Sequence, residues 1–236
     1  MWSTNSAGGR DKNDCEPLLK RSDLNANVDW RLTRISVIAK LAYALPGIPV
    51  LAAFVFNSVY QTKFYVDDLG VAPMRFALAN AIVRAFDLFF YPMIGWFIDN
   101  FRLKDGPFSG RRRPFFVLAS PLVALSFSMI YSPPPNLGVV GILVWFCLWS
   151  LIYGIIPLAL AWMALGAEVT LDDDQRGGVF AYRQVTSNIG RAAGVIAPAV
   201  LITYFQSDHG VSFAAFAIGV ALLTVLFFWS LAAMTR

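Results

Sequence analysis

Residues 76–98 read FALANAIVRAFDLFFYPMIGWFI, a stretch apolar enough and long enough to cross a lipid bilayer that nevertheless contains an arginine and an aspartate. Arg84 and Asp87 lie three positions apart near its middle. A charged side chain at the centre of a membrane helix costs about 2.5–3.5 kcal/mol on insertion scales, so such residues usually face a partner or a water-filled cavity. The stretch therefore predicts a transmembrane helix with a functional polar site, and transport is the first hypothesis.

The composition supports a membrane setting. Hydrophobic residues make up 57% of the chain and charged residues 14%, which excludes an ordinary soluble domain. The net charge of +4 forms no basic patch interleaved with aromatic residues, so we expect no nucleic-acid partner. Cys15 and Cys147 differ too much in setting to suggest a disulfide or a metal site, and we expect neither a metal nor a cofactor.

The chain divides into a tail and a membrane domain. Residues 1–35 are polar and lack hydrophobic periodicity, which predicts a disordered cytosolic tail. Residues 36–236 predict an all-α, polytopic membrane domain, because its apolar runs are far longer than the strands of a barrel. Six transmembrane helices are expected, at about residues 36–60, 76–98, 114–131, 137–166, 184–205 and 211–234.

The distribution of basic residues predicts the orientation. Seven Lys or Arg residues precede position 41, five lie within 102–113, and two more are Arg176 and Arg183. The opposite loops hold only Lys63 and Arg75, so the positive-inside rule places both termini in the cytosol.

A short pattern in the tail bears on the choice of membrane. Residues 14–19 read DCEPLL, which fits the acidic dileucine pattern that sorts proteins to endosomes, lysosomes or vacuoles, although such patterns also arise by chance. The plasma membrane and these internal membranes both stay open.

A polar stripe follows one face of the second span. Spacings of three or four residues place its members on the same side of a helix. Arg84 and Asp87 at the centre of the stripe have two compatible interpretations. They form a salt bridge that stabilises the inserted helix, or the Asp87 carboxylate accepts a proton or cation during transport. The stripe consists of Asn80, Arg84, Asp87, Tyr91, Gly95 and Asp99.

The fifth span combines a basic stripe with small residues. Arg183 and Arg191 share one stripe, and Gly190 and Gly194 form a small-residue ridge that predicts close helix packing. Arg191 and Arg84 are expected to be two buried cations against one buried anion, Asp87. Solvent, a group outside the chain or an anionic ligand would then balance the excess charge.

A further motif joins the second and third spans. Gly95 and Asp99 end the second span, and a basic run precedes the third. A plain positive-inside anchor needs only the arginines, so the joint spacing with glycine and aspartate is more specific. Besides Gly95 and Asp99, the motif includes Arg102, Gly110, Arg111, Arg112 and Arg113.

Together these patterns resemble a known family. Residues 84–99 follow R-x-x-D-x-x-x-x-P-x-x-G-x-x-x-D, residues 110–114 read GRRRP, and residues 164–172 read ALGAEVTLD. They resemble the glycoside–pentoside–hexuronide:cation symporters, the melibiose-permease branch of the major facilitator superfamily, over about residues 40–205. The resemblance implies the N-terminal half of a twelve-helix carrier with a site between two six-helix halves. Either the chain is truncated or a second half, such as another copy, must pair with it.

The resemblance also implies roles for individual residues. Asp87 matches a carboxylate that binds the coupling cation in melibiose permease, and Tyr91 stands where a second carboxylate is found. Loss of that hard oxygen ligand favours proton coupling over sodium coupling. Arg183 matches a sugar-contacting arginine, but the two sugar-binding aspartates fall at about Leu51 and Ala159, which leaves the solute open. The loop motif that ends at Arg113 is implied to act in conformational gating.

Two functions are weighed for the chain. The first is a secondary active transporter of a sugar or another small polar solute, with Asn80, Arg84, Asp87, Tyr91, Arg183 and Arg191 as candidate binding residues. The second is a transport-incompetent isoform that regulates or assembles with a full-length carrier. An enzyme is not expected, because the single histidine, His209, accompanies no nucleophile–base set.

Overall fold

A computed structural model describes residues 36–100, 113–155, 158–168, 173–205 and 209–234, and every regular element in these ranges is helical. The all-α prediction is confirmed for this part of the chain, whereas the predicted disordered tail lies outside it. The helices are α2 (Val37–Ala44), α3 (Gly47–Lys63) with a π-helical continuation (Phe64–Asp68), α4 (Pro73–Asn100), α5 (Arg113–Ile130), α6 (Val139–Ile155), α7 (Leu158–Glu168), α8 (Asp173–Phe205) and α9 (His209–Met234).

Within the described ranges, four stretches of helix are long and apolar enough to cross a membrane: Val37–Asp68, Pro73–Trp96, Gln175–Thr203 and Gly210–Ala233. Phe116–Ile130 and Val139–Gly154 are apolar but shorter. Many large apolar side chains point away from the protein, as in Leu88 and Phe89 of α4. Such an outward-facing apolar surface is typical of a protein in contact with lipid.

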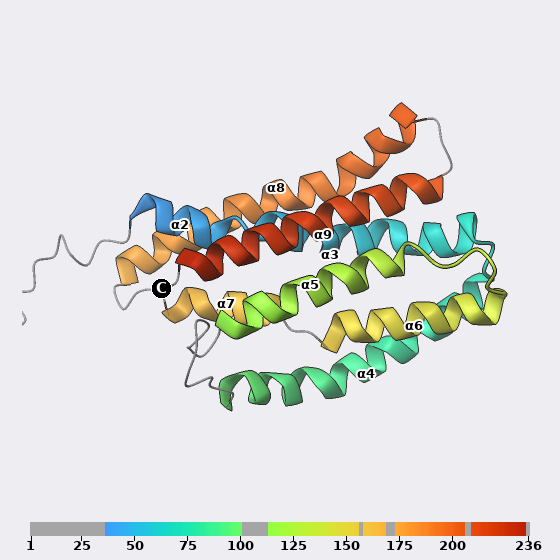
Figure 1. Ribbon diagram of the computed structural model, residues 1–236, viewed down its shortest axis with the longest axis horizontal. Coiled ribbons are helices and arrows are strands. Elements are labelled where there is room, and N and C mark those ends of the chain that lie inside the picture. Colours follow the sequence, from blue (N-terminus) through green and yellow to red (C-terminus); the bar gives the residue numbers. More distant parts are fainter. Residues whose placement is uncertain (1–35, 101–112, 156–157, 169–172, 206–208, 235–236) are drawn as a thin grey trace, which may run out of the picture. The chain divides into compact units, whose positions relative to one another are not determined.

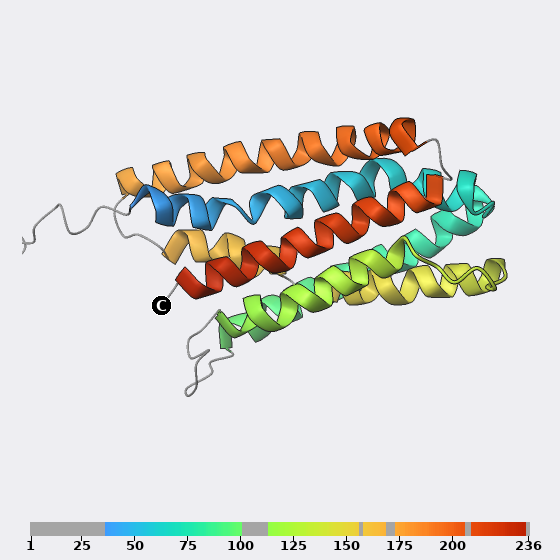
Figure 2. The same cartoon turned by 45° about the horizontal axis from the view of Figure 1, so that its top comes forward.

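The helices run side by side in three close pairs: α3 with α8, α5 with α9, and α4 with α6 (Figures 1 and 2). The first residues of α2, α5 and α8 and the last residues of α4, α7 and α9 gather at one end, on the left of Figure 1. The short connections 69–72 and 131–138 lie at the other end. The helix ends that flank the basic segments of the sequence therefore share one end of the bundle.

The first predicted span is interrupted, since α2 ends at Ala44 and α3 begins at Gly47. Pro46 lies at the break, where its ring disfavours a continuous helix. The backbone carbonyls of Tyr43 and Ala44 accept side-chain hydrogen bonds instead: Trp162 Nε1 donates to Tyr43 at 2.8 Å and Thr186 Oγ1 to Ala44 at 2.7 Å. Side chains of α7 and α8 thus satisfy the polar groups at this break.

The ridge of small residues on α8 packs directly against α3. A Cβ atom at Gly194 would lie 2.6 Å from the carbonyl oxygen of Ala52, and a Cβ atom at Gly190 would overlap the carbonyl of Ile48. Both obstacles are backbone atoms, which cannot rotate away. The predicted role of the two glycines in helix packing is confirmed.

We expect Gly190→Ala to lower the thermal unfolding temperature of the purified protein, because the added methyl group forces α8 away from α3. Overpacking of this kind costs about 1–3 kcal/mol. The matched control is Gly219→Ala in α9, where a Cβ atom meets nothing within 4 Å. That variant should gain up to about 1 kcal/mol from helix propensity. Equal or higher stability of Gly190→Ala would contradict the packing account.

Candidate functional site

A polar cavity of about 220 Å³ lies between α3, α4 and α6. Most of its wall carries side chains with hydrogen-bonding groups, which is unusual within an apolar bundle. The polar lining residues are Asn57, Ser58, Gln61 and Thr62 of α3, Asn80, Arg84, Asp87 and Tyr91 of α4, and Ser150 and Tyr153 of α6.

The predicted ion pair is present in this cavity. Arg84 Nη1 lies 3.1 Å from Asp87 Oδ2, and the side chains are 63% and 8% exposed, respectively. Both residues lie on α4 three positions apart, so the helix itself brings them together. The pair therefore has a buried anionic end and an accessible cationic end.

The buried carboxylate rests against a glycine of the neighbouring helix. A Cβ atom at Gly154 of α6 would overlap Asp87 Oδ1, so any larger residue at this position would displace the carboxylate. Gly154 thereby permits Asp87 to lie against the backbone of α6, which buries its oxygen and leaves Oδ2 for Arg84.

Two buried polar atoms in the wall of the cavity are unpaired. Asn80 Oδ1 and Ser150 Oγ have no hydrogen-bond partner among the described residues. Buried polar atoms are nearly always hydrogen-bonded to protein or to water. These two oxygen atoms therefore leave unused hydrogen-bonding capacity in the wall of the cavity that Asp87 also lines.

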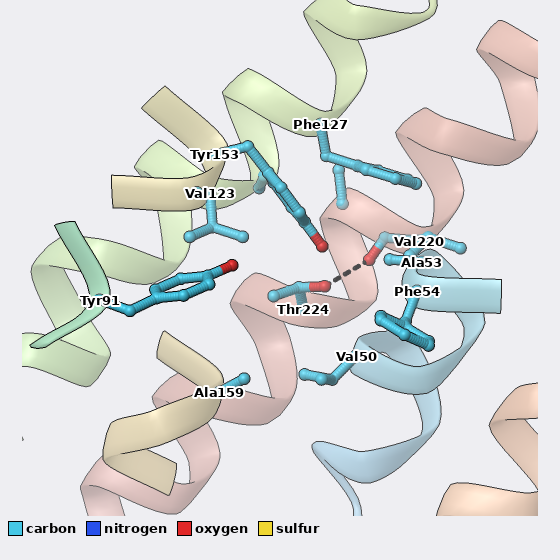
Figure 3. Close-up of a pocket in the computed structure, with 13 residues that line it drawn as sticks. Val50, Ala53, Phe54, Tyr91, Val123, Phe127, Tyr153, Ala159, Val220 and Thr224 are labelled. Carbon is cyan, nitrogen blue, oxygen red and sulfur yellow. Dashed lines mark hydrogen bonds between the residues drawn. The ribbon is translucent and has the colours of Figure 1, made fainter. Parts of the chain in front are cut away.

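A second, apolar cavity of about 360 Å³ adjoins the polar one (Figure 3). It lies between α3, α5, α6 and α9, with Tyr91 of α4 and Ala159 of α7 completing its wall. The two cavities share the lining residues Phe54, Tyr91, Tyr153 and Gly154.

The structure brings four predicted residues together and leaves two elsewhere. Asn80, Arg84, Asp87 and Tyr91 line the polar cavity, whereas Arg183 and Arg191 of α8 line neither cavity. The guanidinium group of Arg183 lies 4.8 Å from the ring centroid of Phe180 and 3.5 Å from the Tyr43 hydroxyl, to which it donates. The hydrogen bond of Arg183 to Tyr43 therefore joins α8 to α2.

The expectation of two buried cations is wrong. Arg191 is exposed and its Nη1 donates to Asn188 Oδ1 at 3.4 Å, and the Arg84 side chain is also largely exposed. Helical spacing shows which residues share a face, but it does not show whether that face points into the bundle. Ser187, four positions from Arg191, is buried, so the polar stripe on α8 is only partly enclosed.

The structure describes only a small part of the loop motif to which the resemblance assigns conformational gating. Gly95 lies in α4, where a Cβ atom would meet nothing within 4 Å. Asp99 and Arg113 belong to α4 and α5, but their side chains lie outside the described part of the chain. Arg102, Gly110, Arg111 and Arg112 lie outside it entirely.

The residues that α3 and α6 contribute to the polar cavity were not among those predicted from the sequence. Asn57 and Gln61 are four positions apart in α3, and Ser150 and Gly154 are four positions apart in α6. This spacing is the same signal that identified the stripe on α4. Polar residues without charge did not stand out among apolar neighbours.

Gly154→Ala is expected to destabilise the protein by about 1–3 kcal/mol, because the new methyl group displaces the Asp87 carboxylate. In a chain that already carries Asp87→Ala, the same substitution should cost much less, since the displaced oxygen is gone. Thermal unfolding of the two single variants and the double variant measures this coupling. If Gly154→Ala lowered the free energy of unfolding equally with and without Asp87→Ala, the contact between residue 154 and Asp87 would be contradicted.

A profile of the family described as MFS/sugar transport protein matches residues 42–236. Sodium-dependent lysophosphatidylcholine symporter 1 of Gallus gallus is 24% identical over 68% of this chain and 30% of its own length. Sphingosine-1-phosphate transporter MFSD2B of Mus musculus is 25% identical over 77% of the chain and 36% of its own length.

Inner membrane symporter YicJ of Escherichia coli is 24% identical over 84% of the chain and 42% of its own length. The matches span less than half the length of these three relatives. The resemblance seen in the sequence motifs is confirmed, because the profile match covers most of the chain. The protein belongs to the MFS/sugar transport family of the major facilitator superfamily.

Proposed function

We propose that the chain is part of a secondary active transporter in which Asp87 and Arg84 couple movement of a solute to movement of a cation. The observation that carries this proposal is the half-exposed ion pair in the polar cavity between α3, α4 and α6. A stable internal salt bridge would need only the two charged groups. The unpaired oxygen atoms of Asn80 and Ser150 add hydrogen-bonding capacity to the wall of the same cavity, which supports a role beyond that of the salt bridge.

The exposed guanidinium of Arg84 and the buried carboxylate of Asp87 suggest how solute binding is coupled to cation binding. A solute that engages the exposed guanidinium of Arg84 competes with Asp87 for it. Because the Asp87 carboxylate is buried, it is costly to leave as an unpaired anion and takes up a proton or another monovalent cation instead. Solute binding and cation binding therefore favour each other.

A proton is the proposed coupling ion. Asp87 is the single carboxylate in the described wall of the cavity, and Tyr91 follows it one turn later. A sodium ion requires several hard oxygen ligands, whereas a proton requires one. The unpaired oxygen atoms of Asn80 and Ser150 nevertheless belong to the same cavity wall, so the test includes sodium.

We also propose a topology of six membrane crossings with both termini in the cytosol, in the plasma membrane or an endosomal, lysosomal or vacuolar membrane. The gathering of the helix ends that flank basic segments at one end of the bundle supports it. The exposed Arg84 and Arg191 are unsuited to contact with lipid. We therefore propose that a second six-helix half, in the same carrier or in a second copy, forms a water-accessible path with this one.

Asp87→Asn should abolish pH-driven solute accumulation while solute exchange continues, since the amide keeps the shape of the carboxylate but accepts no proton. Counterflow and gradient-driven uptake in proteoliposomes, with pH and sodium gradients imposed separately, measure both activities. Asp67→Asn, which makes the same change at an exposed position outside the cavities, is the control. Unchanged pH dependence in Asp87→Asn would remove Asp87 from the coupling step.

A further inference from the structure

The two ends of the bundle differ, and the polar cavity lies toward one of them. The first residues of α2, α5 and α8 form the basic end, and the connections 69–72 and 131–138 form the far end (Figure 1). Helix α4 begins at the far end, and Asp87 lies at its midpoint. Asn80 and Arg84, which line the polar cavity, lie between Asp87 and the far end. The polar wall on α4 therefore extends mainly from the centre of the bundle toward the far end.

A stripe of four residues on α3 changes from apolar to polar in the same direction. Residues four positions apart share one face of a helix. Along this face Val50 lines the apolar cavity, Phe54 lines both cavities, and Ser58 and Thr62 line the polar one. Helix α3 ends toward the far end, so the polar positions of the stripe lie there and the apolar position lies toward the basic end.

The polar cavity is exposed at its rim and buried at its centre. Ser58, Thr62 and Arg84 are exposed, whereas Asp87 is buried. All four line the same cavity, so its wall leads from the surface of the bundle to the carboxylate. A cavity of this size with polar walls can hold water.

A cluster of aromatic rings borders the polar cavity at the far end. The rings of Tyr65 and Phe76 stack with centroids 5.1 Å apart, and the Phe146 ring lies 4.9 Å from Tyr65 and 5.1 Å from Phe76. All three side chains are buried, and Phe146 lines the cavity. A route from the far end would therefore pass beside this cluster, along the exposed Ser58 and Thr62.

The apolar cavity, on the side of the basic end, offers an ion few partners. Of its 13 lining residues, ten have no polar atom in the side chain. The Thr224 hydroxyl already donates to the carbonyl oxygen of Val220 in its own helix at 2.8 Å (Figure 3). Cavities with such walls exclude water. A charge that moved through this cavity would lose its hydration without compensation.

From this asymmetry we infer that water and the coupling ion reach Asp87 from the far end, along Ser58 and Thr62, while the apolar cavity is a dry barrier toward the basic end. The inference rests on the proposed function and specifies the side from which the ion enters in this conformation. A dry barrier on the opposite side keeps an ion at Asp87 from crossing the membrane without the solute.

Labelling of single cysteines with a membrane-impermeant methanethiosulfonate tests the route in the full chain. The background carries Cys15→Ser and Cys147→Ser, and right-side-out and inside-out membrane vesicles expose the two sides in turn. The thiolate is the reactive form of cysteine, so a thiol in contact with hydrocarbon reacts poorly. Ser58→Cys, which replaces one atom at the rim, should react from the far side and lose that reaction when the reagent is on the basic side.

Four further cysteines serve as controls. Asp67→Cys, exposed next to connection 69–72, and Val37→Cys, exposed at the start of α2, report which side the reagent can reach. Val50→Cys lies on the same stripe as Ser58 and should react from neither side, because it lines the dry cavity. Thr62→Cys repeats the test at the rim if Ser58→Cys is poorly expressed.

Labelling of the rim cysteines only from the basic side, equally from both sides, or from neither side would overturn the route. Reaction of Val50→Cys from the basic side as fast as that of Val37→Cys would overturn the dry barrier.

Labelling requires neither solute nor gradient, so it separates this inference from the proposed function. The expected labelling together with unchanged pH dependence in Asp87→Asn would support the route and reject Asp87 as the coupling residue. Loss of pH dependence in Asp87→Asn together with failed labelling of the rim would overturn the route and leave the coupling in place.

Discussion

The burial of one carboxylate constrains much of this half of the bundle. Asp87 is removed from solvent, and a buried anion requires a nearby cation or a proton. Arg84 supplies the cation from the same helix, and the absence of a side chain at Gly154 supplies the space. With α6 in this position beside α4, a side chain at residue 154 would displace the Asp87 carboxylate.

The helix break between α2 and α3 constrains how α7 and α8 pack against them. The helix break at Pro46 leaves backbone carbonyls to be satisfied, and Trp162 and Thr186 supply the donors from α7 and α8. The glycines of α8 bring that helix close enough to α3 for these bonds to form together with direct backbone contact. Helix packing in a membrane depends on such small residues and interhelical hydrogen bonds, because lipid competes equally well for apolar side chains.

The sequence predicted the features that a single helix determines. The Arg84–Asp87 pair depends only on a spacing of three residues. The packing role of Gly190 depends only on the small side chains along one face of α8. The depth of Arg191 and the approach of Gly154 to Asp87 depend on which way each helix is turned in the bundle. Helical periodicity carries no information on that rotation, so the predicted burial of Arg191 was wrong and Gly154 was missed.

The break in the first predicted span precedes a helix that borders the apolar cavity. Val50 of α3 lines this cavity together with Gly154 of α6 and Ala159 of α7. The resemblance to melibiose permease places Ala159 where a sugar-binding aspartate is found, and the structure places its methyl group in an apolar wall. An aspartate there would be a second buried anion without the cation that Asp87 has in Arg84. The apolar wall at residue 159 therefore fits alanine better than an acid.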